Sequence, residues 1–532
     1  MTALDRRSFL KRAGTVTAGA LVMSTGVEAV TRRLAAASPL GVARAESNRA
    51  SVLKGYGELE PRAPINGGEA WLALPAHFQY AVLSRIGDPM SDGTLTPRSC
   101  DGMGAFADGR HGVRLVRNHE IRFSGSGAAA TQGQFVVGRE VGGGMRSYPG
   151  TYDANARGGN TTIRFDRREF HRTGGNVEDF VVNVGTVVNC AGGVHPGQGA
   201  WYTCEEIVQE IGNPTGSPEA QTQPHGYVYP VPAGLSIAQA PAKPQPVVQM
   251  GRFAHEAVAV DPATGIIYET EDAGSGQGSG FYRFLPNNPS NPYAGGTLQI
   301  LGVSNPPTPA RDLRDGFDPE TTVFNVTWIN IVNPNPPGSN VNTVFENGYA
   351  AGAALFNRLE GVFYADRSIF FVSTSGGRVK NGDVNGVDES GRAYNEGYGQ
   401  IWEYRIDEGT LSVLFESPGG SVLDSPDNLA VSPRGGIVLC EDDASDANHT
   451  QPGEDPNFDV STHHGGSRNL LVGLTFEGDA FPLAENVLND SELAGACWSP
   501  DGEFLFCNFF GEDVAGSGGT FAITGPWHKG AL

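Results

Sequence analysis

The sequence predicts an all-β fold, a six-bladed β-propeller with long loop insertions. One unit recurs: a polar or acidic entry, an apolar strand, a tight turn with glycine, a second apolar strand and a polar exit. The exits come at intervals mostly near 65 residues, longer than WD40 or kelch repeats, and the repeat alone would allow roughly five to seven blades. The content of 74 Gly and 35 Pro among 532 residues favours turns over long helices. The exits close at Glu206, Glu271, Glu441 and Asn508, with one larger gap that contains a copy around Glu360.

The clearest copy of this unit lies at 251–284. An alternating apolar run at 254–260, a Thr-Gly turn and a second run at 266–272 predict a β-hairpin, and a third strand follows at 281–284. The His255-Glu256 pair does not belong to a zincin motif, because position 259 is alanine where HExxH requires histidine. Comparable strand pairs are predicted at 359–375, 424–443 and 493–508.

The N-terminus has the features of an export signal. Arg6-Arg7-Ser8-Phe9-Leu10-Lys11 precedes a modestly apolar stretch, and Ala43-Arg44-Ala45 is a small-x-small cleavage site. We therefore expect 1–45 to be a twin-arginine signal peptide that engages the twin-arginine export machinery, and 46–532 to be a single β-propeller domain. This organisation predicts a periplasmic or extracellular protein.

Composition excludes several classes of function. The net charge of −22 argues against nucleic-acid binding, which requires a basic surface. The hydrophobic content of 39% argues against a disordered acidic chain. No run after the signal approaches the ~18 apolar residues of a membrane span. The six cysteines show neither CxxC pairs nor the spacing of a disulfide framework.

The stretch 187–206 carries the most distinctive chemistry. Cys190 ends one β-like run and is followed by two glycines after Ala191, and Glu205 and Glu206 end the next run. A thiol and carboxylates from neighbouring strand ends can bind metal ions, the thiolate being the softer ligand. The alternative is a buried structural cysteine followed by a solvated acidic turn.

The ordered set of motifs resembles the PhoX-type bacterial alkaline phosphatases. Asn-Cys-Ala-Gly-Gly, Thr-Cys-Glu-Glu, Gly-Arg-Phe-x-His-Glu-Ala, Thr-Glu-Asp, Arg-x-Glu-Gly, Pro-Asp-Asn-Leu and Ser-Pro-Asp-Gly follow the twin-arginine signal in that order and cover most of the mature chain. The resemblance implies a six-bladed propeller, a channel-mouth cluster of two ferric irons and about three calcium ions, and hydrolysis of phosphate-ester substrates.

The resemblance also implies roles for individual residues. Arg358, Cys190 and Glu360 would be catalytic, with Arg358 binding the substrate phosphate and Cys190 binding iron. Weaker candidates are Glu120, Glu441 and Asn508. The metal ligands implied are Cys190, Glu206, Glu256, Glu271, Glu360, Asp427 and Asn428.

Three departures from the family pattern bear on the rim of the channel and thus on substrate preference. Val194–Gly197 replaces a Thr-Pro-Trp-Gly loop, Leu359 replaces proline, and Asp443 stands where the family prefers glycine. Two other functions remain open on the sequence: a calcium-dependent propeller lactonase or organophosphate hydrolase, which needs no thiol, and a non-catalytic binding propeller with structural calcium.

Overall fold

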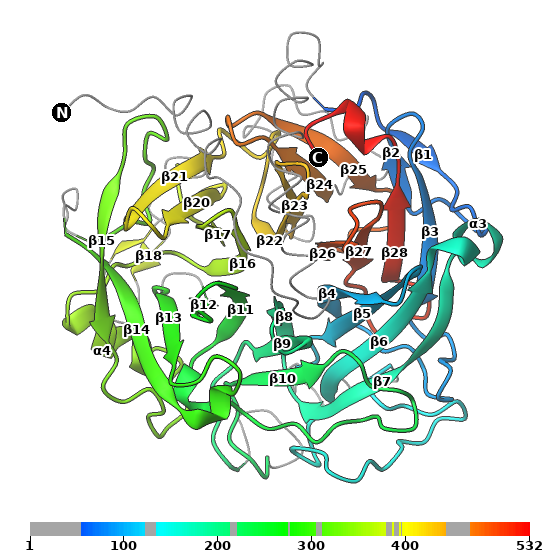
Figure 1. The fold of residues 1–532 in the computed structure, drawn as a ribbon, viewed down its shortest axis with the longest axis horizontal. Helices are drawn as coiled ribbons and strands as arrows, with labels where there is room; N and C mark the ends of the chain where they lie inside the picture. The colour runs from blue at the N-terminus through cyan, green and yellow to red at the C-terminus, as the bar shows by residue number, and fades with distance from the viewer. Residues whose placement is uncertain are drawn as a thin grey trace, which may run out of the picture. The chain divides into compact units, whose positions relative to one another are not determined.

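Antiparallel sheets surround a common centre in the computed structural model of the chain (Figure 1). The residues described are 55–122, 135–212, 221–274, 277–304, 311–378, 396–442 and 469–532, together with two short strands, β18 (Gly386–Val387) and β19 (Ala393–Tyr394). The predicted signal peptide at 1–45 lies outside the described residues. So does Asp443, which departs from the family pattern.

Three of the sheets have three or four strands each. The three-stranded sheet contains β8 (Asn189–His195), β9 (Ala200–Glu205) and β10 (Val228–Pro232). One four-stranded sheet contains β4 (Cys100–Asp108), β5 (Gly112–His119), β6 (Gly158–Asp166) and β7 (Asn176–Thr186). The other has the order β26 (Leu493–Trp498), β27 (Leu505–Phe509), β28 (Gly519–Thr524) and β3 (Gln79–Arg85).

The last of these sheets joins the two ends of the described chain. Ser84 of β3 lies opposite Thr520 of β28 in antiparallel register. Because an N-terminal strand completes a sheet of C-terminal strands, the sheets close into a ring with no break between the first and the last.

Two larger sheets complete the arrangement. In the six-stranded sheet the order is β1 (Glu60–Arg62), β2 (Leu72–Leu74), β25 (Ala480–Asn486), β24 (Leu470–Leu474), β23 (Ile437–Glu441) and β22 (Pro426–Val431). In the nine-stranded sheet it is β11 (His255–Val260), β12 (Ile267–Glu271), β13 (Phe281–Pro286), β14 (Gly296–Val303), β15 (Phe324–Asn330), β21 (Thr410–Glu416), β20 (Gln400–Arg405), β17 (Ser368–Ser373) and β16 (Leu359–Ala365). β15 joins the two halves of this sheet.

Six strands lie innermost in the described part of the chain: β4, β8, β11, β16, β22 and β26. Each contacts the next in this order, and β26 contacts β4. Each also carries a register shift, or β-bulge, just inside its N-terminal end. A bulge inserts an extra residue and re-aims the side chains beside it, so the six strands turn equivalent positions in the same way.

Backbones of neighbouring inner strands approach so closely that side chains do not fit between them. A Cβ at Gly102 would lie 2.5 Å from the Cα of Ala191, and a Cβ at Gly361 would lie 2.9 Å from the Cα of Asn428. Glycine is therefore required at these positions, which follow Asp101 and Glu360 directly. The close approach brings polar residues of different sheets within reach of one another.

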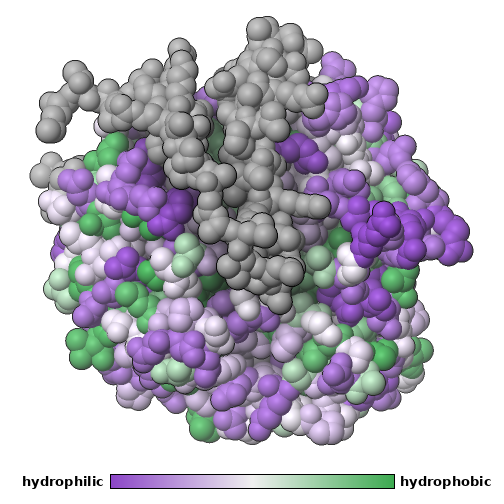
Figure 2. Space-filling model, in the orientation of Figure 1, coloured by the Kyte–Doolittle hydropathy of each residue, from purple (hydrophilic) through white to green (hydrophobic). Residues whose placement is uncertain are grey.

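Apolar side chains fill the spaces between neighbouring sheets. Phe165 of β6 packs against Phe506 of β27, in the next sheet, with ring centroids 5.1 Å apart. Such aromatic contacts hold the sheets together around the centre. Two short α-helices, α3 (Phe170–Thr173) and α4 (Thr343–Ala350), lie outside the inner strands, and Figure 2 shows a strongly hydrophilic surface over α3.

The predicted all-β class is confirmed, and the sheets have a propeller-like arrangement. The hairpin and the third strand predicted at 251–284 correspond to β11, β12 and β13. No helix of the described residues is long and apolar enough to cross a membrane.

Candidate metal centre

The second residues of five of the six inner strands belong to two groups of possible metal ligands. A non-glycine residue with positive φ precedes four of these strands, including Arg358 at 45° before β16 and Val188 at 47° before β8. This left-handed conformation is costly for a side chain and is concentrated at functional sites. The second residues of the first five inner strands are Asp101, Cys190, Glu256, Glu360 and Asp427, and the sixth is Ala494.

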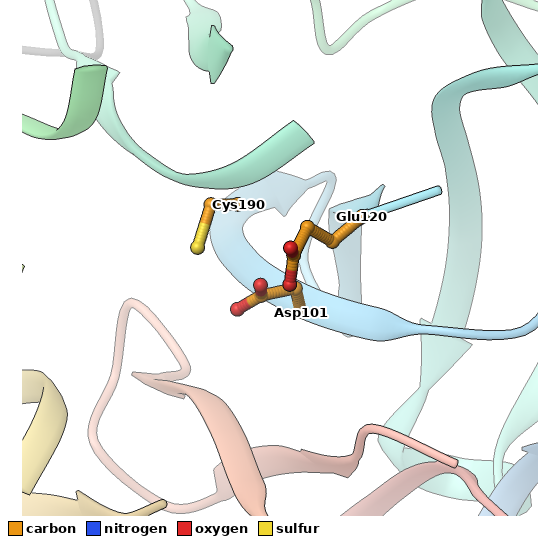
Figure 3. Close-up of side chains that lie close together, drawn as sticks. All are labelled: Asp101, Glu120 and Cys190. Carbon is orange, nitrogen blue, oxygen red and sulfur yellow. The ribbon is translucent and has the colours of Figure 1, made fainter. Parts of the chain in front are cut away.

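One group of ligand atoms surrounds Cys190. Asp101, Glu120 and Cys190 each offer an atom within 4.8 Å of the other two, and Figure 3 shows the three side chains pointing toward one another. Asp101 comes from β4, Glu120 follows β5, and Cys190 comes from β8. One Asp101 oxygen, Oδ1, is buried and makes no hydrogen bond to a described residue.

A second group contains only carboxylates. Glu256, Glu360 and Asp427 offer oxygens within 4.8 Å of one another, and all three residues are buried. Both carboxylate oxygens of Glu256 are buried without a hydrogen-bond partner among the described residues. Carboxylates this close repel one another unless protons or cations neutralise them.

The two groups influence each other electrostatically, and together they are called the acidic unit here: Asp101, Glu120, Cys190, Glu256, Glu360 and Asp427. Burial, followed by the charges of Asp101 and Glu256, raises the pKa of the Cys190 thiol well above its usual range. Burial, followed by the charge of Asp427, likewise raises the pKa of Glu256 and of Asp101. Burial and then Asp272 raise the pKa of Glu360. Each acid therefore resists ionisation until positive charge is supplied.

Arg358 supplies positive charge on one side of this unit. Its Nε and Nη2 donate to Asp272 Oδ2 at 3.0 and 2.9 Å, and Nη2 lies 3.0 Å from Glu360 Oε1. Burial acts to raise the pKa of Asp272, but the guanidinium of Arg358 outweighs it and holds that pKa below the usual value. Arg358 is thus held by Asp272 beside a predicted metal ligand.

Arg122 supplies positive charge elsewhere in the unit. Its Nη2 lies 2.5 Å from Glu120 Oε1 and 2.8 Å from Glu206 Oε2. Burial, with Arg122 acting against it, raises the pKa of Glu206 well above its usual range. The predicted ligand Glu206 therefore faces the acidic unit, as does Glu120, which the sequence marks as a weaker candidate.

The predicted ligand Glu271 does not join either group of ligand atoms in the described residues. Its Oε2 accepts hydrogen bonds from Gly280 N at 2.9 Å and Tyr282 Oη at 2.7 Å. Burial raises the pKa of Glu271 to about 8. Asp272, the next residue along, is the acid that reaches Arg358, because adjacent residues at a strand end point to opposite faces.

Two other predicted candidates hold the fold locally. Glu441 accepts from Asp424 N at 3.0 Å and from Leu470 N at 2.9 Å. Asn508 donates to Asp101 O and accepts from Thr520, both at 2.6 Å.

Asn428, a predicted metal ligand, uses both ends of its amide. Its Nδ2 donates to Asp427 Oδ1 at 2.8 Å, and its Oδ1 accepts from Gly495 N at 2.5 Å. Asn428 thus orients Asp427 and ties β22 to β26.

Four residues in or beside the acidic unit were not predicted from the sequence: Asp101, Arg122, Asp272 and Glu492. Asp101 is the second residue of a strand in which Gly102 and Gly104 obscure the apolar alternation. Glu492 precedes β26, and its pKa is raised by burial and then by Asp442. The recurrence of an acid one residue after a structural acid, as in Glu205-Glu206 and Glu271-Asp272, is the signal that could have identified Asp272.

The donor set fits bound metal ions. It combines one thiol with several buried carboxylates whose oxygens are not all satisfied by protein donors. Carboxylates are the ligands that hard cations such as calcium and ferric iron prefer, and a thiolate adds a donor that favours iron over calcium.

Comparisons with known proteins identify a family and a fold. Residues 55–511 match the model of the family described as alkaline phosphatase PhoX. The structure is similar to that of Pseudomonas fluorescens PhoX in complex with vanadate, a transition state analogue, with 16% sequence identity, coverage of 90% of this chain and 99% of that chain, and a TM-score of 0.59. No curated protein matches the sequence.

Two further solved structures show weaker similarity. Chaetomium thermophilum Sqt1 has 8% identity, a TM-score of 0.32 and coverage of 84% of this chain and 98% of its own. Kuenenia stuttgartiensis hydrazine synthase has 12% identity, a TM-score of 0.27 and coverage of 67% and 88%.

Proposed function

Because the chain belongs to the PhoX family of alkaline phosphatases, and is therefore a phosphoric ester hydrolase, we propose that it is an exported, metal-dependent enzyme that releases inorganic phosphate from phosphate esters. One observation supports this proposal above the others: acids from separate strands converge with a single thiol beside two arginines. An acidic protein that handles an anionic substrate needs local positive charge, and metal ions together with arginines can supply it.

We propose a mixed cluster of ferric iron and calcium, with two irons and about three calcium ions as the family resemblance implies. Cys190 and nearby carboxylates would hold iron. Glu206, Glu256, Glu360 and Asp427 would share the remaining ions, and Asp101 and Glu120 join this set on the geometry described above. Bound metal ions would polarise phosphoryl oxygens and lower the pKa of an oxygen nucleophile.

The chain's own residues bind and orient the substrate. Arg358 can donate bidentate hydrogen bonds to a phosphoryl group, the geometry that guanidinium groups favour with phosphate. Asp272 holds Arg358 in place through its Nε and Nη2 hydrogen bonds. Glu360 lies beside the same guanidinium, so it couples the phosphate-binding arginine to the proposed cluster.

We further propose that the propeller has six blades and that 46–532 is one domain. The six inner strands with equivalent bulges support the blade number, since each would begin one blade. The twin-arginine motif at the N-terminus supports export of the folded protein to the periplasm or beyond. That route allows metals to be inserted before export.

The test combines elemental analysis with hydrolysis of p-nitrophenyl phosphate by protein purified from the periplasmic fraction. We expect iron and calcium in the protein, hydrolysis that vanadate inhibits, and retention in the cytoplasm when Arg6 and Arg7 are replaced by lysine. Calcium without iron, together with lactone hydrolysis in place of phosphate release, would favour the lactonase alternative. A fully metal-loaded protein with no phosphatase activity would overturn the proposal.

A further inference from the structure

In the described part of the chain two arginines contact the acidic unit, and Arg122 is the more exposed of them. Its side chain is 58% exposed, whereas that of Arg358 is 28% exposed. The two acidic side chains that Arg122 contacts are far less exposed: 9% for Glu120 and 12% for Glu206. The guanidinium therefore lies between the buried acids and the solvent.

Arg122 also keeps part of its hydrogen-bonding capacity. Both of its ion pairs use Nη2, and within the described ranges neither Nε nor Nη1 donates to a protein atom. Arg358 differs, because Asp272 engages both its Nε and its Nη2. A guanidinium has five donors in a planar fork, so Arg122 can hold Glu120 and Glu206 and still present donors to an anion.

The two arginines act on one shared acid. The charges of both Arg122 and Arg358 reach Glu206, and the charge of Arg122 also reaches Cys190. A phosphoryl group bound by Arg358 beside Glu360 would thus have Arg122 as a second cation nearby. Since the reacting phosphoryl must face the buried ligands, the leaving group must extend toward solvent, where Arg122 is exposed.

We propose that Arg122 is a substrate-binding residue that recognises an anionic group on the leaving-group side of the phosphate ester. This inference rests on the proposed phosphatase function and adds a substrate class to it: phosphate monoesters whose leaving group carries a carboxylate or a second phosphate. Cations bound to Glu120 and Glu206 would weaken the attraction that now holds Arg122 to these acids, which frees its charge for such a group.

The test uses a substrate pair that differs in leaving-group charge and little in shape, para-carboxyphenyl phosphate and its methyl ester. The kcat/KM ratio of the acid to the ester is measured for the wild type and for Arg122→Met, Arg122→Gln and Arg122→Lys. The ratio cancels intrinsic differences between the leaving groups. Arg164→Met is the matched control, because Arg164 also bridges two acids, Asp108 and Glu178, and is 40% exposed.

We expect Arg122→Met and Arg122→Gln to lower the acid-to-ester ratio about tenfold through KM, which corresponds to one partly exposed charge contact. Arg122→Lys should retain part of the preference, and Arg164→Met should leave the ratio unchanged. Calorimetric binding of para-carboxybenzylphosphonate and its methyl ester, which the enzyme cannot hydrolyse, should show the same loss of preference.

An acid-to-ester ratio in both neutral variants within twofold of the wild-type value would overturn the role of Arg122. So would an equal loss in the Arg164→Met control. If the wild-type protein, loaded with iron and calcium, hydrolysed neither of the two phosphate substrates, the proposed phosphatase function itself would be overturned. The two failures are therefore distinguishable.

Discussion

Glu205 and Glu206 are neighbours in the sequence and have opposite surroundings. Glu205 accepts hydrogen bonds from His225 Nδ1 at 2.6 Å, Gly226 N at 2.8 Å, Val187 N at 3.1 Å and other donors, so protein groups satisfy it. Among the described residues Glu206 forms an ion pair with Arg122, and the charges of Glu120 and Asp272 act on it against the charges of Arg122 and Arg358. One acid completes the fold, whereas the other is available to a ligand.

The same contrast recurs in two other hairpins. Glu271 and Glu441 end their strands and accept backbone hydrogen bonds, whereas Asp272 and Asp442 follow them and act electrostatically on the acidic unit. Position in the hairpin therefore separates the acids that accept hydrogen bonds within their own sheet from the following acids, whose charge acts on the acidic unit. Each prediction below tests one side of this division.

The largest effect is expected when a proposed metal ligand is removed. Cys190→Ala and Glu360→Ala should each lower kcat by about 10⁴-fold or more, because a lost metal ligand removes several kcal/mol of transition-state stabilisation. Hydrolysis of p-nitrophenyl phosphate and elemental analysis measure the effect. Far-ultraviolet circular dichroism should remain that of the wild type, and turnover at the wild-type rate in either variant would contradict the assignment.

Substitution of the neighbouring acids should produce opposite outcomes. Glu205→Leu should lower the free energy of unfolding by about 3–5 kcal/mol, because it leaves buried donors and the His225 ring without their acceptor. Metal content of the folded fraction should stay unchanged. Denaturant titration and elemental analysis provide the two readouts.

Glu206→Gln is the matched variant for this pair. It should lower metal content and activity while stability changes by less than about 1 kcal/mol. The division between the two acids would be wrong if both variants lost metal to the same extent.

A smaller effect is expected from pH on the stability of the fold, through the ion pair between His225 and the structural acid Glu205. His225 lies 2.6 Å from Glu205 and 3.4 Å from Asp153, and although burial alone would lower its pKa, the two carboxylates raise it to about 9. Since the pKa is near 6.5 in the unfolded chain, this ion pair stabilises the fold fully below pH 6.5. The free energy of unfolding falls by about 3 kcal/mol as the pH rises from 6.5 through 9.

Thermal unfolding measured between pH 6 and 10 checks this expectation. His225→Gln should unfold at a lower temperature than the wild type at pH 6, and its unfolding temperature should fall less between pH 7 and 10. An equal pH dependence in both proteins would show that other groups control the decline.

Much of the architecture could be predicted from the sequence, because apolar alternation around glycine turns marks hairpins such as β11–β12 without tertiary information. Cys190 and Glu360 could be singled out through ordered motifs. The sequence could not show whether Glu271 or Asp272 faces inward, because a bulge and one set of hydrogen bonds decide this. Arg122 was invisible for a related reason: its partners Glu120 and Glu206 come from different sheets.

The pairing of β3 with β28 has a consequence for biosynthesis. Ser84 emerges from the ribosome long before its partner Thr520, and at 5–20 residues per second the interval is roughly 20 to 90 s. During that time the first strand lacks the sheet that it completes, so the nascent chain cannot yet assume its final closed form. A chain that terminates early exposes an unpaired β-edge, a feature by which quality control could distinguish it from one ready for translocation.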